Sequence, residues 1–309
     1  MSRFLLLSLI MESILKEQMV STRREALKAR AKHLVDAYDK MLSRVKAQDK
    51  AKEEIGMAAL MWVSHSQRPL RADELCHALA VKIGSVDLDP ESVPSIRTLL
   101  DCCQGLLAVD KEASTVRLVH STLRRYLSTH SDFSGRAHTA MAETCLTYLN
   151  FQQFQNPPTN EPPDPIQAPF LGYSSIYWGA HARQKLSDRA KCLALKLLTH
   201  YGDHLSAGLL LEHALDPVDF SKIKGFSSFT GLHCASFFGI AEIVAALMGI
   251  PGCDVDQEDC VGNTPLKWAA RNNHESVEGL LRERGDVALS IPSRSSSSPP
   301  LHAKRKRME

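Results

Sequence analysis

One segment of the chain repeats itself at an interval of 34 residues, and this periodicity limits the folds open to it. Thr230-Gly231-Leu232-His233-Cys234-Ala235-Ser236 aligns with Thr264-Pro265-Leu266-Lys267-Trp268-Ala269-Ala270. Further along, Ile243 aligns with Val277 and Leu247 with Leu281 at the same interval. A repeat of this length indicates a unit that buries its apolar face only by stacking on a neighbour. We expect a short solenoid of helix pairs over residues 230–288.

The interval and the residues within it resemble ankyrin repeats. A Thr-Pro turn begins the first helix of such a repeat, and small alanines let neighbouring repeats pack closely. Asn263-Thr264-Pro265-Leu266 matches this pattern well, whereas Thr230-Gly231-Leu232-His233 is a degenerate copy. Two repeats fall short of the ~3 that an independent solenoid needs. The helices expected at 188–215 therefore either cap the stack or remain from a longer array.

Ankyrin-type repeats imply a non-catalytic protein-binding function, in which exposed turns vary and the alanine and leucine positions pack. The predicted protein-binding residues are the turn positions Asp259, Val261 and Asn263, with Trp268 and Arg271 on the helix that follows. Trp268 has an alternative interpretation as a core residue between repeats, because a large aromatic side chain is usually well buried.

The first half of the chain contains the elements of a winged-helix domain. Apolar spacing predicts helices at 22–47, 51–65 and 71–82, and a fourth that has Pro94 in its first turn. Leu106–Val109 and Thr115–Val119 flank a polar turn and predict a β-hairpin. Helices around Leu123–Leu127 and at 136–151 follow. The expected fold class is mainly α: a winged-helix domain, a helical region and a short ankyrin-repeat solenoid.

Composition shifts divide the chain into six parts. Six of the fifteen prolines lie between 153 and 170, which predicts an extended, semi-rigid linker. The expected parts are a helical segment at 1–50, a winged helix at 51–151, a linker at 152–170, a helical region at 171–229, two repeats at 230–288 and a disordered basic tail at 289–309.

The winged-helix region resembles the one that follows the NACHT nucleoside-triphosphatase domain in fungal receptor-like proteins, a type also named after GPI inositol-deacylase. The matching stretches are Gly56–Val63, Arg68–Leu75 and Val116–His120, and residues 2–50 resemble the end of a NACHT module. Ankyrin repeats commonly follow in such proteins. The resemblance implies the regulatory or sensor part of a NACHT-ankyrin signalling protein.

The phosphate-binding loop of that family is missing from this sequence. Such a loop needs Gly-x4-Gly-Lys-Ser/Thr, and no lysine here precedes Ser or Thr. The resemblance makes His120 a weak candidate for contacting nucleotide, with local packing or helix capping as the alternative role. An ATP- or GTP-dependent switch whose NACHT domain is supplied upstream or in trans remains an alternative function.

The charge balance argues against a dedicated nucleic-acid binder. Thirty-seven Lys and Arg nearly cancel thirty-five Asp and Glu, so no strong overall field attracts a polyanion. The helix that would enter a DNA groove offers only Arg97 as a cation. The tail segment Lys304-Arg305-Lys306-Arg307 is either a solvated tail or a nuclear import signal. A nuclear DNA-associated regulator is therefore kept as a second alternative.

No pattern predicts an enzyme, a cofactor or a metal site. The two Gly-x-Ser-x segments, at Gly172 and Gly225, lack the closing glycine of a nucleophile elbow. His200 and His204 with Asp203 fall short of a zinc ligand set. The apolar run 4–11 is interpreted as a buried helix, with no membrane association, and eight cysteines without a C-x-x-C pair favour a reducing compartment. We expect a cytoplasmic, or else nuclear, protein.

Overall fold

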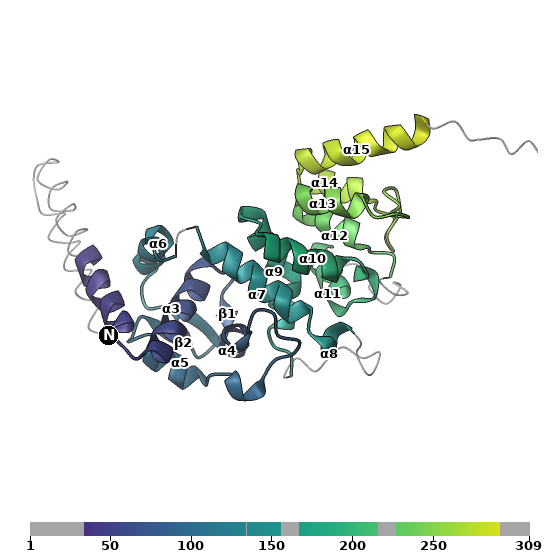
Figure 1. Ribbon diagram of the computed structural model, residues 1–309. Coiled ribbons are helices and arrows are strands. Elements are labelled where there is room, and N and C mark those ends of the chain that lie inside the picture. Colours follow the sequence, from purple (N-terminus) through teal and green to yellow (C-terminus); the bar gives the residue numbers. More distant parts are fainter. Residues whose placement is uncertain (1–33, 134, 156–166, 216–226, 291–309) are drawn as a thin grey trace, which may run out of the picture.

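The computed structural model describes residues 34–133, 135–155, 167–215 and 227–290, with side chains described as far as Glu283. A helix over 34–46 leads into a winged helix, which continues through α7 into a stack of paired helices (Figure 1). This architecture confirms the predicted mainly helical fold class. Residues 1–33 of the predicted helical segment 1–50 and residues 291–309 of the predicted tail 289–309, with Lys304–Arg307, lie outside the described residues.

The winged helix places a small antiparallel sheet against helices. Strand β3 lies between β1 and β2, and Val116 of β3 pairs with both Leu70 and Val109. Val116 and Leu70 are fully buried with Leu75 and Leu99 from two of the helices. The elements are α3 (Lys50–His65), β1 (Leu70–Arg71), α4 (Ala72–Ala80), η1 (Pro90–Ser92), α5 (Ile96–Cys102), β2 (Leu107–Asp110), β3 (Thr115–Leu118) and α6 (Ser121–Thr129).

Two local features differ from the sequence prediction. Helix α5 begins at Ile96, and not around Pro94, because the Ser95 side chain accepts a hydrogen bond from the Thr98 amide and caps the helix. The two-residue strand β1 was not predicted, because it is too short to show any alternation of apolar and polar residues.

The second half consists of helices that stack in pairs. They are α7 (Ala137–Leu149), α8 (Gln152–Gln155), α9 (Leu171–Gln184), α10 (Asp188–Leu198), η2 (Tyr201–Asp203), α11 (Leu205–Ala214), α12 (Gly231–Phe238), α13 (Ala241–Met248), α14 (Pro265–Arg271) and α15 (Glu275–Ser290). Helix α12 lies between α9 and α14, and α13 lies between α10 and α15. The pairs α9/α10, α12/α13 and α14/α15 therefore form one stack, which has one more helix pair than the sequence repeat.

The close approach of α9 to α12 depends on a glycine. A Cβ on Gly179 would lie 2.1 Å from Cγ of Phe238, and the neighbouring Trp178 packs its ring edge-on against Phe238 with centroids 5.0 Å apart. Gly179 thus has the role in α9 that small alanines have in the recognised repeats. This contact joins the extra pair to the stack.

The winged helix and the stack share one apolar core. Helix α7 packs against α3 on one side and against α9 and α10 on the other. Phe154, Ala168 and Phe170, at the two ends of the predicted linker, are buried in this core. Gln152–Gln155 is helical, and residues 156–166, which hold most of the linker prolines, lie outside the described residues.

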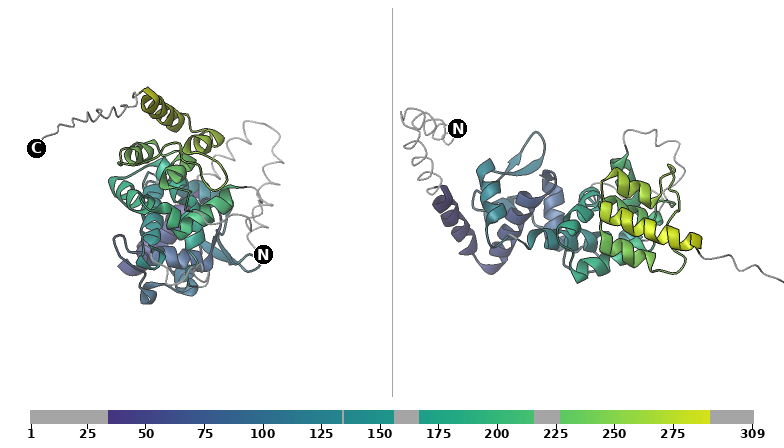
Figure 2. Two further views of the ribbon diagram at one scale, coloured as in Figure 1. Left: turned by 90° about the vertical axis from the view of Figure 1, so that its right-hand side faces the viewer. Right: turned by 90° about the horizontal axis from the view of Figure 1, so that it is seen from above.

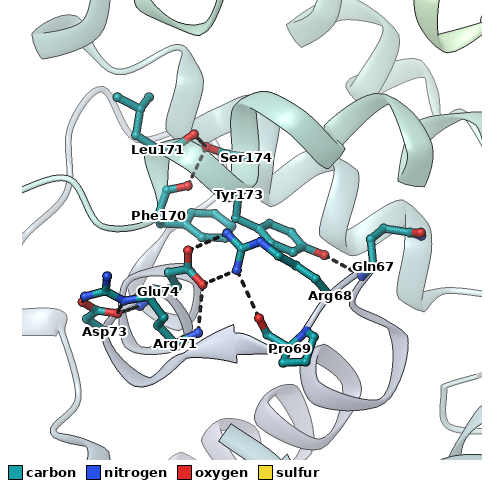
Figure 3. Close-up of polar contacts among 10 residues, drawn as sticks. All are labelled: Gln67, Arg68, Pro69, Arg71, Asp73, Glu74, Phe170, Leu171, Tyr173 and Ser174. Carbon is teal, nitrogen blue, oxygen red and sulfur yellow. Dashed lines mark hydrogen bonds and ion pairs between the residues drawn. The ribbon is translucent and has the colours of Figure 1, made fainter. Parts of the chain in front are cut away.

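A half-buried ion pair lies at the junction between the winged helix and α9. Arg68 donates two hydrogen bonds to the Glu74 carboxylate, at 2.8 and 2.7 Å, and its guanidinium lies over the ring of Tyr173 (Figure 3). The ring of Tyr177 also lies close to this guanidinium, with its centroid 5.8 Å from Cζ. The Tyr173 hydroxyl also accepts from the Gln67 amide at 3.1 Å. These contacts anchor the turn before β1 on the first helix of the stack.

A chain of histidines continues this junction. His181 Nε2 lies 2.9 Å from the Tyr173 hydroxyl, and its Nδ1 lies 2.8 Å from Nδ1 of His138 on α7. Burial, together with the neighbouring His138, lowers the pKa of His181 to about 3. In a neutral His181 one ring nitrogen donates a hydrogen bond and the other accepts one. The neutral ring can therefore bond to Tyr173 on one side and to His138 on the other.

Candidate protein-binding surface of the repeats

The loops of the stack gather at one of its ends, and we call this end the turn surface. It is made of η2, residues 227–230 and the loop 249–264. Thr264 begins α14 by accepting a hydrogen bond from the Lys267 amide, and Pro265 occupies the first helical position. The Thr-Pro pair seen in the sequence thus fixes where the loop ends and the helix starts.

Asp259 organises the loop before α14. Its Oδ1 accepts hydrogen bonds from the backbone amides of Val261 and Asn263, both at 2.9 Å, and its Oδ2 accepts from Trp268 Nε1 at 2.7 Å. The carboxylate is 6% exposed. Three donors around one buried carboxylate hold the turn in a single shape.

His233 joins this loop to the preceding repeat. Its Nδ1 accepts a hydrogen bond from the Thr230 amide at 3.1 Å, so Nε2 carries the proton. Nε2 donates to the carbonyls of Gln257 and Asn263 at 3.0 and 3.2 Å. Burial lowers the pKa of His233 and favours this neutral form. His233, the histidine of the first repeat motif, therefore connects the two repeats through hydrogen bonds.

The five predicted binding residues divide into internal and exposed groups. Asp259 and Trp268 are buried, with Trp268 only 1% exposed, so neither is available to a partner. This corrects their prediction as contact residues, and the core alternative holds for Trp268. Val261 and Asn263 are half-buried. Arg271 is exposed and lies 5.6 Å from the Trp268 ring centroid.

A cavity of about 340 Å³ opens on the turn surface, between η2 and the loop 249–264. Its walls include the apolar side chains Leu198, Leu232, Leu247 and Ile250, and the acidic side chains Asp203 and Asp254 also line it. Its volume is at the lower end of the ~300–1,000 Å³ typical of ligand pockets. It suits one or two partner side chains.

Ile250 is the exposed apolar group at this cavity, with 39% of its surface open. Neither Ile250 nor the two aspartates was predicted from the sequence as a protein-binding residue. The sequence features that could have indicated them are weak. Ile250 is the last apolar residue of the run that contains α13, and Asp254 belongs to the acidic stretch 254–259. Only the fold brings η2 and this loop together.

His120 is the N-cap of α6. Its Nδ1 accepts a hydrogen bond from the Thr122 amide at 3.2 Å and lies 2.7 Å from the Thr122 hydroxyl. Capping is thus the role that the structure shows for the residue predicted as a weak nucleotide contact.

Neither a metal site nor a membrane span is found in the described part of the chain. No cluster of three or more His, Cys, Asp or Glu side chains among those residues is arranged to hold a metal ion. None of the described helices combines the length and apolar character needed to cross a membrane.

Comparison with known families agrees with this architecture. Residues 38–138 match the family described as GPI inositol-deacylase, winged helix domain. Residues 191–290 match the family described as ankyrin repeats, in three copies. The chain contains a winged-helix domain of this type followed by ankyrin repeats. The ankyrin match begins within α10, so it extends beyond the two repeats predicted at 230–288.

Among curated proteins, calmodulin-binding transcription activator 4 from Arabidopsis thaliana is 37% identical over 92 residues. The matched region covers 26% of this chain and 9% of that protein, so the chain spans only a small fraction of the length of this relative. No solved structure gives a significant match. Ankyrin repeats support a protein–protein interaction module.

Proposed function

We propose that the chain is a non-catalytic protein-binding module that serves as the regulatory part of a NACHT-ankyrin signalling protein in the cytoplasm or nucleus. Its partner is a protein that inserts side chains into the cavity on the turn surface. Inside the loop before α14, Trp268 donates to the Asp259 carboxylate, and His233 donates to the Gln257 carbonyl. On the same surface, Ile250, Asp203 and Asp254 remain open to solvent. This contrast is the observation that carries the proposal.

This arrangement supports binding because the partner meets a surface already held in place. Loops fixed by internal hydrogen bonds lose little conformational entropy when they bind. The exposed side chain of Ile250 supplies apolar area to bury, and the carboxylates fix the orientation of the partner. The winged helix contributes a fixed base, since α7 joins both parts in one core.

The test compares two substitutions of equally exposed apolar residues. Ile250 is 39% exposed on the turn surface, and Val119 is 41% exposed on the winged helix. The tagged full chain and its two variants, Ile250→Asp and Val119→Asp, are each expressed in cells. The proteins that co-purify with each are then quantified. We expect a specific set of proteins to fall at least ten-fold with Ile250→Asp and to persist with Val119→Asp. Loss with Val119→Asp alone would place the binding site on the winged helix.

A further inference from the structure

Among the described residues, the charged side chains that line the cavity on the turn surface are the carboxylates of Asp203 and Asp254. Many carboxylates of the described surface lie within 4 Å of a lysine or arginine, for example Asp73 with Arg71 and Glu278 with Arg282. Among the described residues, Asp203 and Asp254 have no such partner, and no Lys or Arg lines the cavity. Asp256 and Glu258 follow on the same exposed loop. Lys267 lies 3.9 Å from Glu258, and its ammonium donates to the Gly262 carbonyl.

The apolar walls and the acidic rim together fit one kind of side chain. Lysine and arginine carry a long aliphatic stem that packs on apolar surface and a charged head that stays near water or a carboxylate. Ile250, which is 39% exposed, offers apolar surface for the stem, and the buried Leu198 and Leu247 also line the cavity. Asp203 and Asp254 offer the carboxylates for the head. A partner segment rich in lysine and arginine is therefore complementary to this cavity.

The chain itself carries such a segment. Lys304-Arg305-Lys306-Arg307 follows α15 along the sequence. Helix α15 runs back along α14, so its far end lies on the side of the stack where the loop 249–264 leads into α14 (Figures 1 and 2). Residues 291–303 connect that helix end to the basic segment, and at ~3.5 Å per residue they reach as far as about 45 Å.

We propose that Lys304–Arg307 docks into the cavity on the turn surface and competes there with the protein partner. Tethering through a short connection raises the local concentration of the segment to the millimolar range, so even a weak contact is populated. A partner that takes the cavity releases the basic segment, and binding is thereby coupled to exposure of a candidate nuclear import signal. This regulation rests on the proposed binding function of the same surface.

The test uses the full chain and a labelled peptide of residues 301–309 as probe. In one variant Lys304, Arg305, Lys306 and Arg307 are all replaced by alanine, which leaves the cavity free. At 50 mM salt we expect this variant to bind the peptide at least ten-fold more tightly than the unaltered chain, whose own tail competes. The difference should disappear at 0.5 M salt, because exposed charge pairs are screened.

Two further variants locate the contact. Asp203→Asn with Asp254→Asn, made in the tail-neutral chain, should abolish peptide binding, whereas Glu275→Gln at the opposite end of α15 should leave it unchanged. Equal peptide binding by the unaltered and tail-neutral chains overturns the docking of the chain's own tail. Unchanged binding after the two aspartate substitutions overturns the site.

Protein concentration distinguishes the tail of the same molecule from that of a second copy. Competition that is constant from 2 to 50 μM protein supports docking within one molecule, and competition that grows over this range overturns it. The co-purification experiment with Ile250→Asp does not depend on the tail. If the peptide fails to bind and the partner set is still lost with Ile250→Asp, the proposed function stands and the tail inference alone fails.

Discussion

Removing the Asp259 carboxylate tests whether the loop before α14 is held from within. Asp259→Ala deletes the acceptor for three donors. The amides of Val261 and Asn263 belong to half-buried residues that water can reach. The indole N–H of Trp268 is in a side chain only 1% exposed. A buried donor left without a partner costs about 1–3 kcal/mol. With the weaker amide losses added, we expect the free energy of unfolding to fall by about 2–4 kcal/mol.

The assay is urea and thermal unfolding followed by circular dichroism. For a domain of this size each kcal/mol lowers the melting temperature by roughly 2–4 °C, so Asp259→Ala should melt about 5–15 °C below the unaltered chain. Asp256→Ala is the matched control, because Asp256 is an exposed aspartate on the same loop. It should change the free energy of unfolding by less than about 0.5 kcal/mol.

A double-mutant cycle then isolates the bond between Asp259 and Trp268. Trp268→Phe removes the indole N–H and keeps an aromatic ring. In the Asp259→Ala background that N–H already lacks its acceptor, so its removal should cost less. We expect a coupling energy of about 1–2 kcal/mol. Additive effects within about 0.5 kcal/mol would refute the internal role of Asp259, as would an Asp259→Ala variant that melts with the Asp256→Ala control.

Two further predictions concern the joints of the stack. Gly179→Ala should destabilise the chain by about 1–3 kcal/mol, because its Cβ would clash with Phe238. Gly172→Ala, on the same helix and facing open space, should be neutral or stabilising, and urea unfolding of both variants decides the matter. The pKa of His181 is about 3 in the folded chain and about 6.5 when unfolded. The unfolded state therefore binds the extra proton, and stability is lost as pH falls from about 7 toward 4. His181→Gln should reduce the loss between pH 7 and pH 5 by about 1–2 kcal/mol. A variant that loses stability over this range as steeply as the unaltered chain would contradict this assignment.

The sequence predicted the winged helix well because its elements have strong local signals. The helix at 51–65 appears as α3 at Lys50–His65, and the hairpin expected around 106–119 appears as β2 and β3. The spacing of apolar residues decides such elements, since it depends on neighbours in the chain. The helix start near Pro94 was misplaced, because capping by Ser95 is a side-chain event that spacing does not report.

The pair α9/α10 escaped detection for a different reason. The connection from Leu198 to Gly231 is much longer than that from Met248 to Pro265, so the 34-residue interval is lost. Helix α9 also lacks a Thr-Pro start and uses Gly179 where the other repeats use alanine. Its place in the stack follows from contacts between residues far apart in the sequence.

The exposed side chains of the candidate binding surface could be predicted only in part, because some turn residues point to solvent and others point into the protein. Asp259 and Trp268 lie in a turn and on a helix where exposed positions are expected, yet they bond to each other across the loop. Asp203 and Asp254 meet only through the folding of η2 against the loop 249–264. Sequence spacing identifies the turn, and three-dimensional packing decides which of its side chains a partner can reach.

Site-specific photo-crosslinking in cells tests the central claim most directly. A photoreactive residue is placed at position 250 on the turn surface or at position 86 on the winged helix, where Val86 is 62% exposed. We predict adducts between the full chain and a second protein from position 250 and none from position 86. Adducts that form from position 86 and are missing from position 250 would contradict a binding function for the turn surface of the repeats.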